Sequence, residues 1–487
     1  MRMRQLILAL VICVSSKGFA QSQTTGASRS SGDVLTLQES IDYALKHNVS
    51  LRQSELQVRN SSNTLEQSRW LKYPTLNGSY SLNSNFGRNI DPFSNSIVTQ
   101  TIGTNSIGVG AGVTIFNGHQ IKNTVSLNEL NLEASTYDFQ AMKNNVTLQV
   151  VVAYLNVLST EDMIEVAQKQ LEVTQLQIQR TEKLVKAGAV PETNLYDLQA
   201  QLASDELQKV NADNNHESAI LTLKQAMNLP AERDVSVVRV NVPNPSIQAY
   251  PESAIAIYEA AIAYLPEVKA ADTRIKAADK SIMLAKALGL PTISANTSWG
   301  TAYSTAAKTA TAGEPTVIAI PATATFQGQT VPFTLNYPQP SYTTSGIPYF
   351  RQLGNNQNLN LGVALRVPIF NSYQAKYRTT GAKIQKMQSE LQSESTKLQI
   401  RQSIDQAYIT MLNAAKRYTA TASQVSILEK SFEAAAARYN AGSANYTDFN
   451  LSKTNLDRAK ANLVQAKYDY IFRIKILDFY QNKPLDF

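Results

Sequence analysis

The chain has 487 residues, of which 43% are hydrophobic and 17% are charged, and its formal net charge is +7. Beyond residue 20 the sequence contains no apolar run of about 18 residues, so we expect no membrane-spanning helix. Lys and Arg are scattered rather than clustered, which argues against nucleic acid as a partner.

The N-terminus has the three-part layout of a secretory signal peptide. Residues 1–4 carry two arginines, residues 6–14 are apolar, and residues 18–20 read Gly-Phe-Ala. A charged start, an apolar core and a small-residue exit are typical of such signals. We therefore predict a signal peptide over residues 1–20, cleaved after Ala20. The alternative is a short buried helix.

The residue types that usually carry chemistry form no recognisable set. Cys13 is the one cysteine and lies inside the predicted signal, after Ile12 where a lipoprotein signal has a small residue. His47, His119 and His216 fall in different predicted elements without metal-ligand spacing. Since no nucleophile motif or phosphate loop is present either, we expect no metal, no cofactor and no enzymatic activity.

The first predicted elements follow an N-terminal arm. Residues 21–35 form this arm, which is rich in Ser, Thr and Gly in its first part and is predicted to be flexible. Thr36 and Glu39 match a capping box, which predicts a short helix to about Lys46. A second helix is expected from about 50 to 72, where a proline two residues later ends it.

A first structural repeat is predicted over residues 36–230. Its two strands alternate between apolar and small or polar residues, which is typical of strands with one apolar face. The predicted helices are about 37–72 and 118–228, and the predicted strands are about 75–83 and 106–116.

The stretch from Asn117 to Gly188 is the longest predicted helix. It contains no glycine or proline from 119 to 187, which at 1.5 Å per residue gives a rod of roughly 100 Å. Two apolar series with a seven-residue step predict packing on both flanks of this rod. The first contains Val125, Leu132, Phe139, Val146 and Ala153 and resumes after a stutter at Val157; the second contains Leu127, Ala134, Ala141, Leu148 and Leu155.

The same order of elements returns after a proline-rich linker at 231–252. Gly188 and Thr193 recur as Gly442 and Thr447, each displaced by 254 residues (442 − 188). A constant displacement over such a length indicates internal duplication. The second repeat is predicted over residues 253–487, with strands at about 292–303 and 358–370 and an exposed loop without periodicity at about 304–357.

Four strands of about ten residues, each with an apolar face, suit a membrane β-barrel but are too few to close one. Identical chains that share a barrel remove the open edges, and three chains would supply twelve strands. The alternative is a small soluble sheet covered by helices. Apolar seams on two flanks favour helices arranged as staves of a ring, with a solid bundle as the alternative.

With these features the mature chain resembles the TolC-like outer-membrane efflux and secretion channel family. Residues 35–41 look like its opening motif, residues 113–118 and 367–371 like its strand-to-helix junctions, and Gly188 and Gly442 like its helix tips. The resemblance implies a mainly α protein with a membrane β-barrel. Four strands per chain would complete a twelve-stranded barrel in a homotrimer, continued by a long periplasmic α-helical barrel.

The resemblance also implies a location and partners. The chain would lie in the lipid of the outer membrane of a Gram-negative bacterium, with a large periplasmic part. It would dock on a periplasmic adaptor, or membrane fusion, protein linked to an inner-membrane pump. Its function would be that of a passive exit duct in tripartite efflux or type I secretion. The alternative is a periplasmic coiled-coil scaffold or adaptor without a channel.

The two helix tips are the predicted docking surface. Glycine permits a sharp turn, threonine can cap the returning helix, and small side chains leave a groove for a partner. The alternative is that both glycines only form turns. The candidate docking residues are Gly188, Ala189, Val190, Thr193, Leu195, Gly442, Ser443, Ala444, Thr447 and Phe449.

The same resemblance suggests a gate near the tips. Tyr439 and Asp448 match family positions that constrict the closed entrance, whereas Asn194 replaces an acid and Ala444 and Leu451 replace other family gate residues. One Asp448 from each subunit would form a ring that favours cations. The alternative is an ordinary aspartate favoured by the helix dipole.

Aromatic residues occur on or near the predicted strands. Trp70, Tyr80, Trp299 and Tyr303 would form an interfacial belt in a membrane, or core packing in a soluble sheet. Arg366 on a polar strand face is expected to point into the lumen.

Overall fold

The computed structural model describes residues 33–90, 95–99, 101–239 and 250–483. The predicted signal peptide and residues 21–32 of the predicted arm lie outside this range. The chain divides into two compact units, which we call the strand unit and the tip unit. The strand unit covers Ser50–Met142 and Ser253–Asp405, and the tip unit takes its described residues from Met1–Val49, Lys143–Glu252 and Gln406–Phe487.

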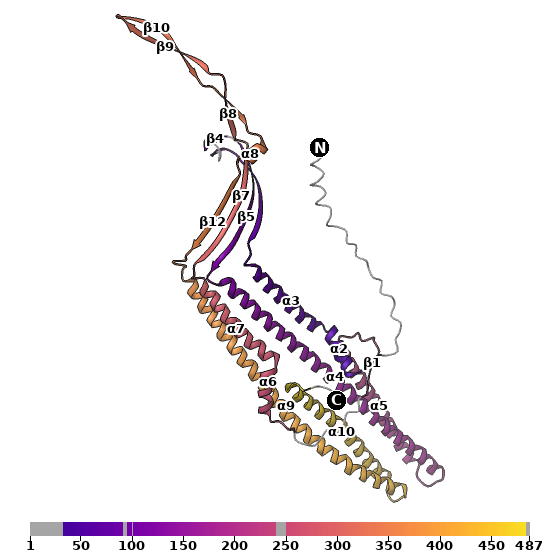
Figure 1. Ribbon diagram of the computed structural model, residues 1–487. Coiled ribbons are helices and arrows are strands. Elements are labelled where there is room, and N and C mark those ends of the chain that lie inside the picture. Colours follow the sequence, from indigo (N-terminus) through magenta and orange to yellow (C-terminus); the bar gives the residue numbers. More distant parts are fainter. Residues whose placement is uncertain (1–32, 91–94, 100, 240–249, 484–487) are drawn as a thin grey trace. The chain divides into compact units, whose positions relative to one another are not determined.

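The strand unit is built on a four-stranded antiparallel sheet with the order β12-β7-β5-β2 (Figure 1). All four predicted strands are confirmed. They are β2 (Thr75–Asn85), β5 (Ile102–Asn117), β7 (Thr292–Ser304) and β12 (Asn358–Arg366). The last strand ends before residue 370, where the prediction placed its end, because Pro368 has no N–H for the ladder.

One face of this sheet is apolar. Residues that lie directly opposite in a ladder share a face, and the row across the sheet through Leu76, Ala111, Thr297 and Leu361 is followed by the row through Val109, Trp299 and Leu359. The opposite face carries rows of Ser, Asn and Gly, such as Ser79, Gly108 and Gly300. Leu76, Leu361 and Val363 are 73%, 75% and 73% exposed in the single chain.

Apart from the short helix α8 (Tyr349–Asn355), the helices of the strand unit lie beyond one end of the sheet (Figure 1). α3 and α7 end just before β2 and β7, whereas α4 and α9 begin just after β5 and β12. The helices concerned are α3 (Val49–Trp70), the first part of α4 (Gln120–Lys186), α6 (Ala254–Tyr264), α7 (Pro266–Ala287) and the first part of α9 (Gln374–Asn440). None of the described helices combines the length and hydropathy needed to cross a bilayer.

The first part of α4 packs against a helix on each flank, as its two seams predict. The hydroxyls of Ser61 on α3 and Ser135 on α4 lie 2.9 Å apart, and on the other side Asp138 of α4 pairs with Arg274 of α7. In the second repeat, Lys397 of α9 bonds Asp272 of α7 at 2.9 Å. Long helices therefore lie beside shorter ones in both repeats.

Both strand-to-helix junctions turn in the same unusual way. Gly118 and His119 have φ of 62° and 67°, and Ser372 and Tyr373, 254 residues later, have φ of 52° and 57°. Two successive left-handed residues turn the chain sharply from the sheet into the helix. At Gly118 the turn also needs space, since a Cβ atom there would lie 2.6 Å from Cβ of Leu290.

The prediction of an irregular loop at 304–357 is wrong. It contains two antiparallel ladders, β8 with β11 and β9 with β10, followed by a short helix. We call residues 308–346 the hairpin extension. Its strands are β8 (Lys308–Ala312), β9 (Thr316–Phe326), β10 (Gln329–Gln339) and β11 (Tyr342–Gly346), and the helix is α8 (Tyr349–Asn355). A smaller hairpin, β3 (Arg88–Ile90) with β4 (Ile97–Thr99), also lies at the end of the sheet away from the helices.

The tip unit consists mainly of long helices, which are connected by two turns at Gly188 and Gly442. Thr160 of α4 contacts His216 of α5 at 3.1 Å, and the Tyr468 hydroxyl of α10 donates to Asp162 of α4 at 2.9 Å. The helices are α2 (Leu37–His47), the second parts of α4 and α9, α5 (Thr193–Ala226) and α10 (Tyr446–Tyr480). Thr36 and Glu39 form the predicted capping box.

A parallel two-stranded ladder completes the tip unit. β1 (Asp33–Leu35) pairs with β6 (Val235–Val237), and the buried Tyr154 hydroxyl donates to the Val238 carbonyl at 2.8 Å. Both strands fall in segments that were predicted to be irregular, the N-terminal arm and the inter-repeat linker. That prediction is wrong for these residues, because two short strands so far apart in sequence leave no local pattern.

Candidate functional site: the two helix tips

The two helix tips have the same backbone geometry. Gly188 has φ of 70° and Gly442 has φ of 71°, so both long helices end in a left-handed residue, and the sharp glycine turns predicted from the sequence are present. The N–H of Ala189 donates to the Leu184 carbonyl at 2.9 Å, and the N–H of Ser443 donates to the Arg438 carbonyl at 2.9 Å. Each glycine also donates back three residues, so both turns are Schellman motifs.

The returning helices begin differently, and the predicted threonine caps are wrong. Thr193 is the first residue of α5, and Glu192 before it makes no side-chain capping bond. Thr447 lies inside α10, whose cap is Asn445; the side chain of Asn445 accepts from the Asp448 N–H at 2.8 Å. The sequence signal for this cap was present, since asparagine three residues before an acid is a common helix start.

Most candidate docking residues are accessible at the tips. Phe449 is the exception, because it is 4% exposed and packs inside the tip. Exposed candidates are Gly188, Ala189, Thr193, Gly442, Ser443 and Thr447; half-buried ones are Val190, Leu195 and Ala444. Both turns therefore present small side chains at the surface.

An aromatic cluster supports the second tip from inside. The rings of Tyr439 and Phe449 stack with centroids 5.0 Å apart, and Phe432 lies 5.6 Å from Phe449. Tyr446 and Leu198 of α5 complete the buried cluster. Burial raises the pKa of Tyr446 from 10 to about 12.

The three candidate gate residues occupy different environments. Tyr439 is half-buried in the aromatic cluster, Asn194 is half-buried on α5, and Asp448 is exposed in the first turn of α10. A link between the two long helices was not predicted from the sequence. Arg180 of α4 donates to the Asn440 side chain of α9 at 2.5 Å, next to the second turn.

A buried ionic cluster ties α5 to α10 farther along the helices. Lys453 lies 3.1 Å from Asp205 and 2.8 Å from Asp457, and the side chains of Lys453 and Asp205 are only 4% and 3% exposed. Thr174 of α4 and Gln201 also donate to Asp205, at 2.5 and 2.7 Å. The cluster joins three helices, and the sequence did not predict it because the partners lie far apart in the chain.

The sequence profile of the outer membrane efflux protein family matches residues 40–229 and 257–472. These two segments correspond to the two structural repeats and cover most of the chain. The chain belongs to the outer membrane efflux protein family. It is accordingly a protein of the outer membrane, and the scaffold alternative receives no support. No curated protein matches the sequence of this efflux protein.

Solved structures share the fold of this efflux protein at low sequence identity. The CmeC outer membrane channel of Campylobacter jejuni has a TM-score of 0.68 and 18% identity, covering 92% of this chain and 87% of that one. The open state of the MtrE outer membrane channel of Neisseria gonorrhoeae has a TM-score of 0.65 and 17% identity, with coverages of 96% and 95%. A membrane protein from Pseudomonas aeruginosa has a TM-score of 0.70 and 15% identity, with coverages of 91% and 90%.

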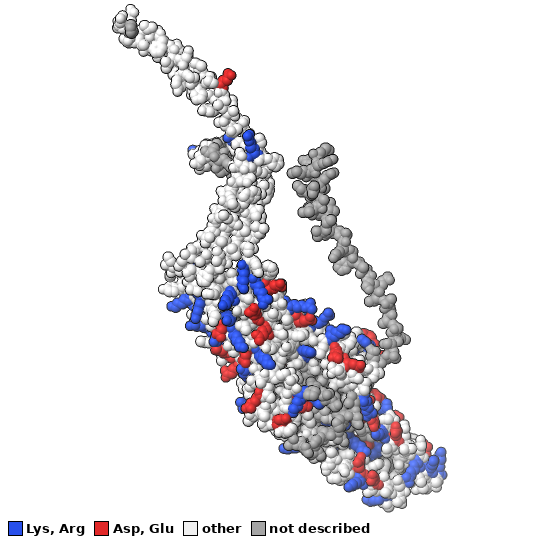
Figure 2. Space-filling view, in the orientation of Figure 1, with Lys and Arg blue, Asp and Glu red and all other residues white. Residues whose placement is uncertain are grey.

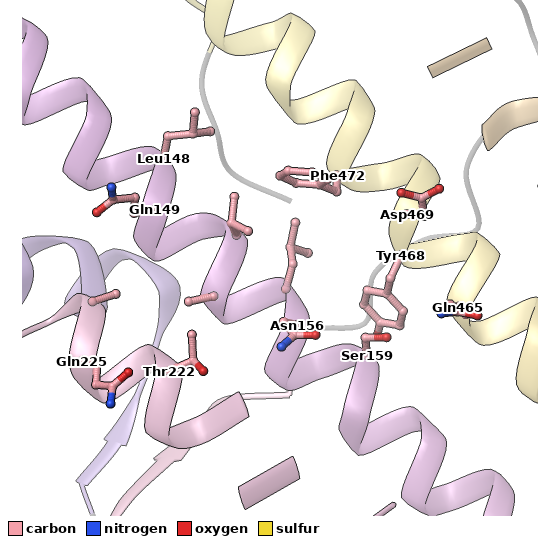
Figure 3. A pocket seen from close by; sticks show the side chains of 14 residues that line it. Leu148, Gln149, Asn156, Ser159, Thr222, Gln225, Gln465, Tyr468, Asp469 and Phe472 are labelled. Carbon is pink, nitrogen blue, oxygen red and sulfur yellow. The ribbon is translucent and has the colours of Figure 1, made fainter. Parts of the chain in front are cut away.

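The tip unit of the efflux protein also holds a cavity of about 690 Å³ between α4, α5 and α10 (Figure 3). Leu148 and Phe472 give it apolar walls, and Asn156 and Gln225 add amides. Its ionisable groups are already partnered, since Tyr468 donates to Asp162 and Asp469 accepts from Arg473. Ser159 and Thr222 add hydroxyls to the lining, and the described residues contain no cluster of metal ligands.

Proposed function

We propose that this efflux protein is a passive exit duct in which three copies share a twelve-stranded barrel in the outer membrane. The observation that carries the proposal is the sheet itself. Its edge strands β12 and β2 pair with no other strand among the described residues, and its apolar face is open. Neighbouring copies would satisfy the edges, and lipid would cover the apolar face.

The distribution of charge supports a membrane position for the sheet. Figure 2 shows Lys, Arg, Asp and Glu gathered over the helices and almost absent over the strands. The opposite, polar face of the sheet would line the lumen with Ser, Asn and Gly. A lining of small, uncharged polar residues suits a conduit whose transport energy comes from a partner.

We propose further that both helix tips dock on a periplasmic adaptor that connects the duct to an inner-membrane pump. The two Schellman turns present matching small, exposed residues, and the duplication places one in each repeat. A partner helix can pack closely where side chains are small. In this arrangement Phe449 acts as internal support for the docking surface.

The docking proposal is tested by capture from cysteines placed at the turns. Ala189→Cys and Ser443→Cys, each the single cysteine of the mature chain once the predicted signal is cleaved, are treated in intact cells with a short bifunctional thiol–amine cross-linker. We expect both to capture the same periplasmic protein, identified by mass spectrometry. Glu217→Cys, exposed on α5 away from the turn, is the matched control and should capture less. Failure of both tip variants would contradict docking at the tips.

Asp448 is proposed to form an acidic ring at the periplasmic entrance. Three exposed carboxylates around one opening would raise the local concentration of cations. In planar bilayers, Asp448→Asn should lower the cation-over-anion permeability ratio of the purified protein. Glu433→Gln, exposed on α9, is the control. An unchanged ratio in Asp448→Asn would assign Asp448 to the helix terminus alone.

A further inference from the structure

The hairpin extension has one apolar face that is open in the single chain. In the β9–β10 ladder, Ile320, Phe333 and Tyr337 share this face and are 45%, 45% and 57% exposed. The pairs on the apolar face are Ile318–Tyr337, Ile320–Leu335, Ala322–Phe333 and Ala324–Val331. A two-stranded hairpin on its own is only marginally stable in water, so a partner on this face would stabilise the extension.

The edges of the extension are unsuited to adding another strand. Pro321 lies in β9, and Pro332 and Pro338 lie in β10. At these positions a backbone N–H would point away from the hairpin and could donate to an added strand. Proline has no N–H, so it offers no such donor. Proline on an edge is a common protection against strand addition. The partner is therefore expected on the apolar face rather than along an edge.

The composition of the extension identifies the chemistry of this partner. Between residues 305 and 350 the charged residues are Lys308 and Glu314 alone, and Figure 2 shows the extension almost free of charge. A surface that lies on anionic lipid headgroups normally carries several Lys or Arg residues. A neutral apolar face instead matches a second neutral apolar face.

The base of the extension is anchored to the sheet and to α8, at the end opposite the long helices α4 and α9. The Thr305 N–H donates to the Gly103 carbonyl at 2.9 Å, and the Ile347 N–H donates to the Ala307 carbonyl at 3.2 Å. The buried Gln352 of α8 bonds both the N–H and the carbonyl of Ser304. In a trimer, three extensions would therefore rise from one rim at a high effective concentration.

We propose that the three hairpin extensions of a trimer pack their β9–β10 apolar faces against one another outside the membrane. The occupant of each face is thus the same face of a second copy of this chain. The inference rests on the proposed trimer. It gives this inserted segment a role as an outer cap that joins the three subunits on the side opposite the helices.

Neighbouring residues on opposite faces supply the test. Ala322→Cys lies on the apolar face opposite Phe333, and Thr323→Cys lies on the other face opposite Pro332. Each variant, whose mature chain carries this one cysteine, is purified in detergent and oxidised. We expect Ala322→Cys to give several-fold more disulfide-linked dimer than Thr323→Cys. Adding Phe333→Asp should lower that yield several-fold, whereas Thr334→Asp on the other face should not.

Native electrophoresis of the same samples separates this inference from the proposed function. If the protein is a trimer and the variants at positions 322 and 323 give the same yield of cross-linked dimer, including none, the inference is overturned and the proposed duct still stands. A monomer would overturn both. An independent readout is the fluorescence of a label on each cysteine, measured in vesicles that contain a quencher in the lipid phase. Strong quenching at 322 would show that lipid covers the face and would also overturn the inference.

Discussion

The surroundings of Lys453 bear directly on the stability of the tip unit. Its ammonium is buried between two carboxylates from α5 and α10. Lys453→Met would leave Asp205 buried without its cation, and removing one partner of a buried pair costs about 3–5 kcal/mol. Thermal unfolding followed by circular dichroism should show this loss in the helical signal.

Lys460→Met is the matched control on the same helix. Lys460 pairs with Glu429, and both side chains are more than a third exposed, at 40% and 46%. Exposed pairs contribute about 0–1 kcal/mol. Equal losses in the two variants would contradict a special role for the buried cluster.

Asp457 gives the same cluster a pH dependence. Burial raises the pKa of Asp457 above its ordinary value of 3.8, although the Lys453 ammonium opposes this shift. A raised folded pKa means that the contribution of Asp457 to stability is fully present below pH 3.8 and is lost as the pH rises through the folded pKa. The unfolding temperature of the wild type, relative to that of Asp457→Asn, should therefore rise as the pH falls. A difference that is constant with pH would contradict this assignment.

At the scale of elements, the glycine turns are the most directly testable feature. Gly188 and Gly442 share one backbone conformation, and a Cβ atom at either would meet nothing within 4 Å. Alanine at either position should cost about 1–2 kcal/mol from the left-handed backbone alone, and asparagine less. Gly118→Ala should cost more, because its Cβ would also lie 2.6 Å from Leu290. Thermal unfolding compares the three, and a smaller loss at Gly118 would refute the steric argument.

Long helices and alternating strands were predictable, because their patterns repeat over many residues. The seams of α4 and the four strands of the sheet follow directly from spacing of three to four or of two residues. The hairpin extension was missed although Val331, Phe333, Leu335 and Tyr337 alternate. The intervening prolines read as loop signals, and they are tolerated because both strands are edges.

The candidate site was predictable in its backbone and less so in its side chains. Glycine spacing located both turns, since a left-handed residue after a long helix has few alternatives. The cap at Asn445 had a local signal in the sequence, whereas the Arg180–Asn440 bond and the burial of Phe449 depend on side chains that meet only after folding. Pairing between residues hundreds of positions apart leaves no local signal in one sequence.

At the scale of the whole molecule, a charged substitution should have different effects on trimer assembly on the two faces of the sheet. Leu361 lies on the apolar face, and Asn360 lies on the polar face beside Ser298. An arginine facing lipid near the bilayer midplane costs about 2–4 kcal/mol, whereas a lumen-facing one mainly alters selectivity. Since every copy in a trimer carries the substitution, Leu361→Arg should strongly reduce the amount of heat-modifiable oligomer in outer-membrane fractions. Asn360→Arg should assemble normally and change the ion preference of the pore. If Asn360→Arg blocked assembly while Leu361→Arg did not, the sheet would face the membrane with its other side.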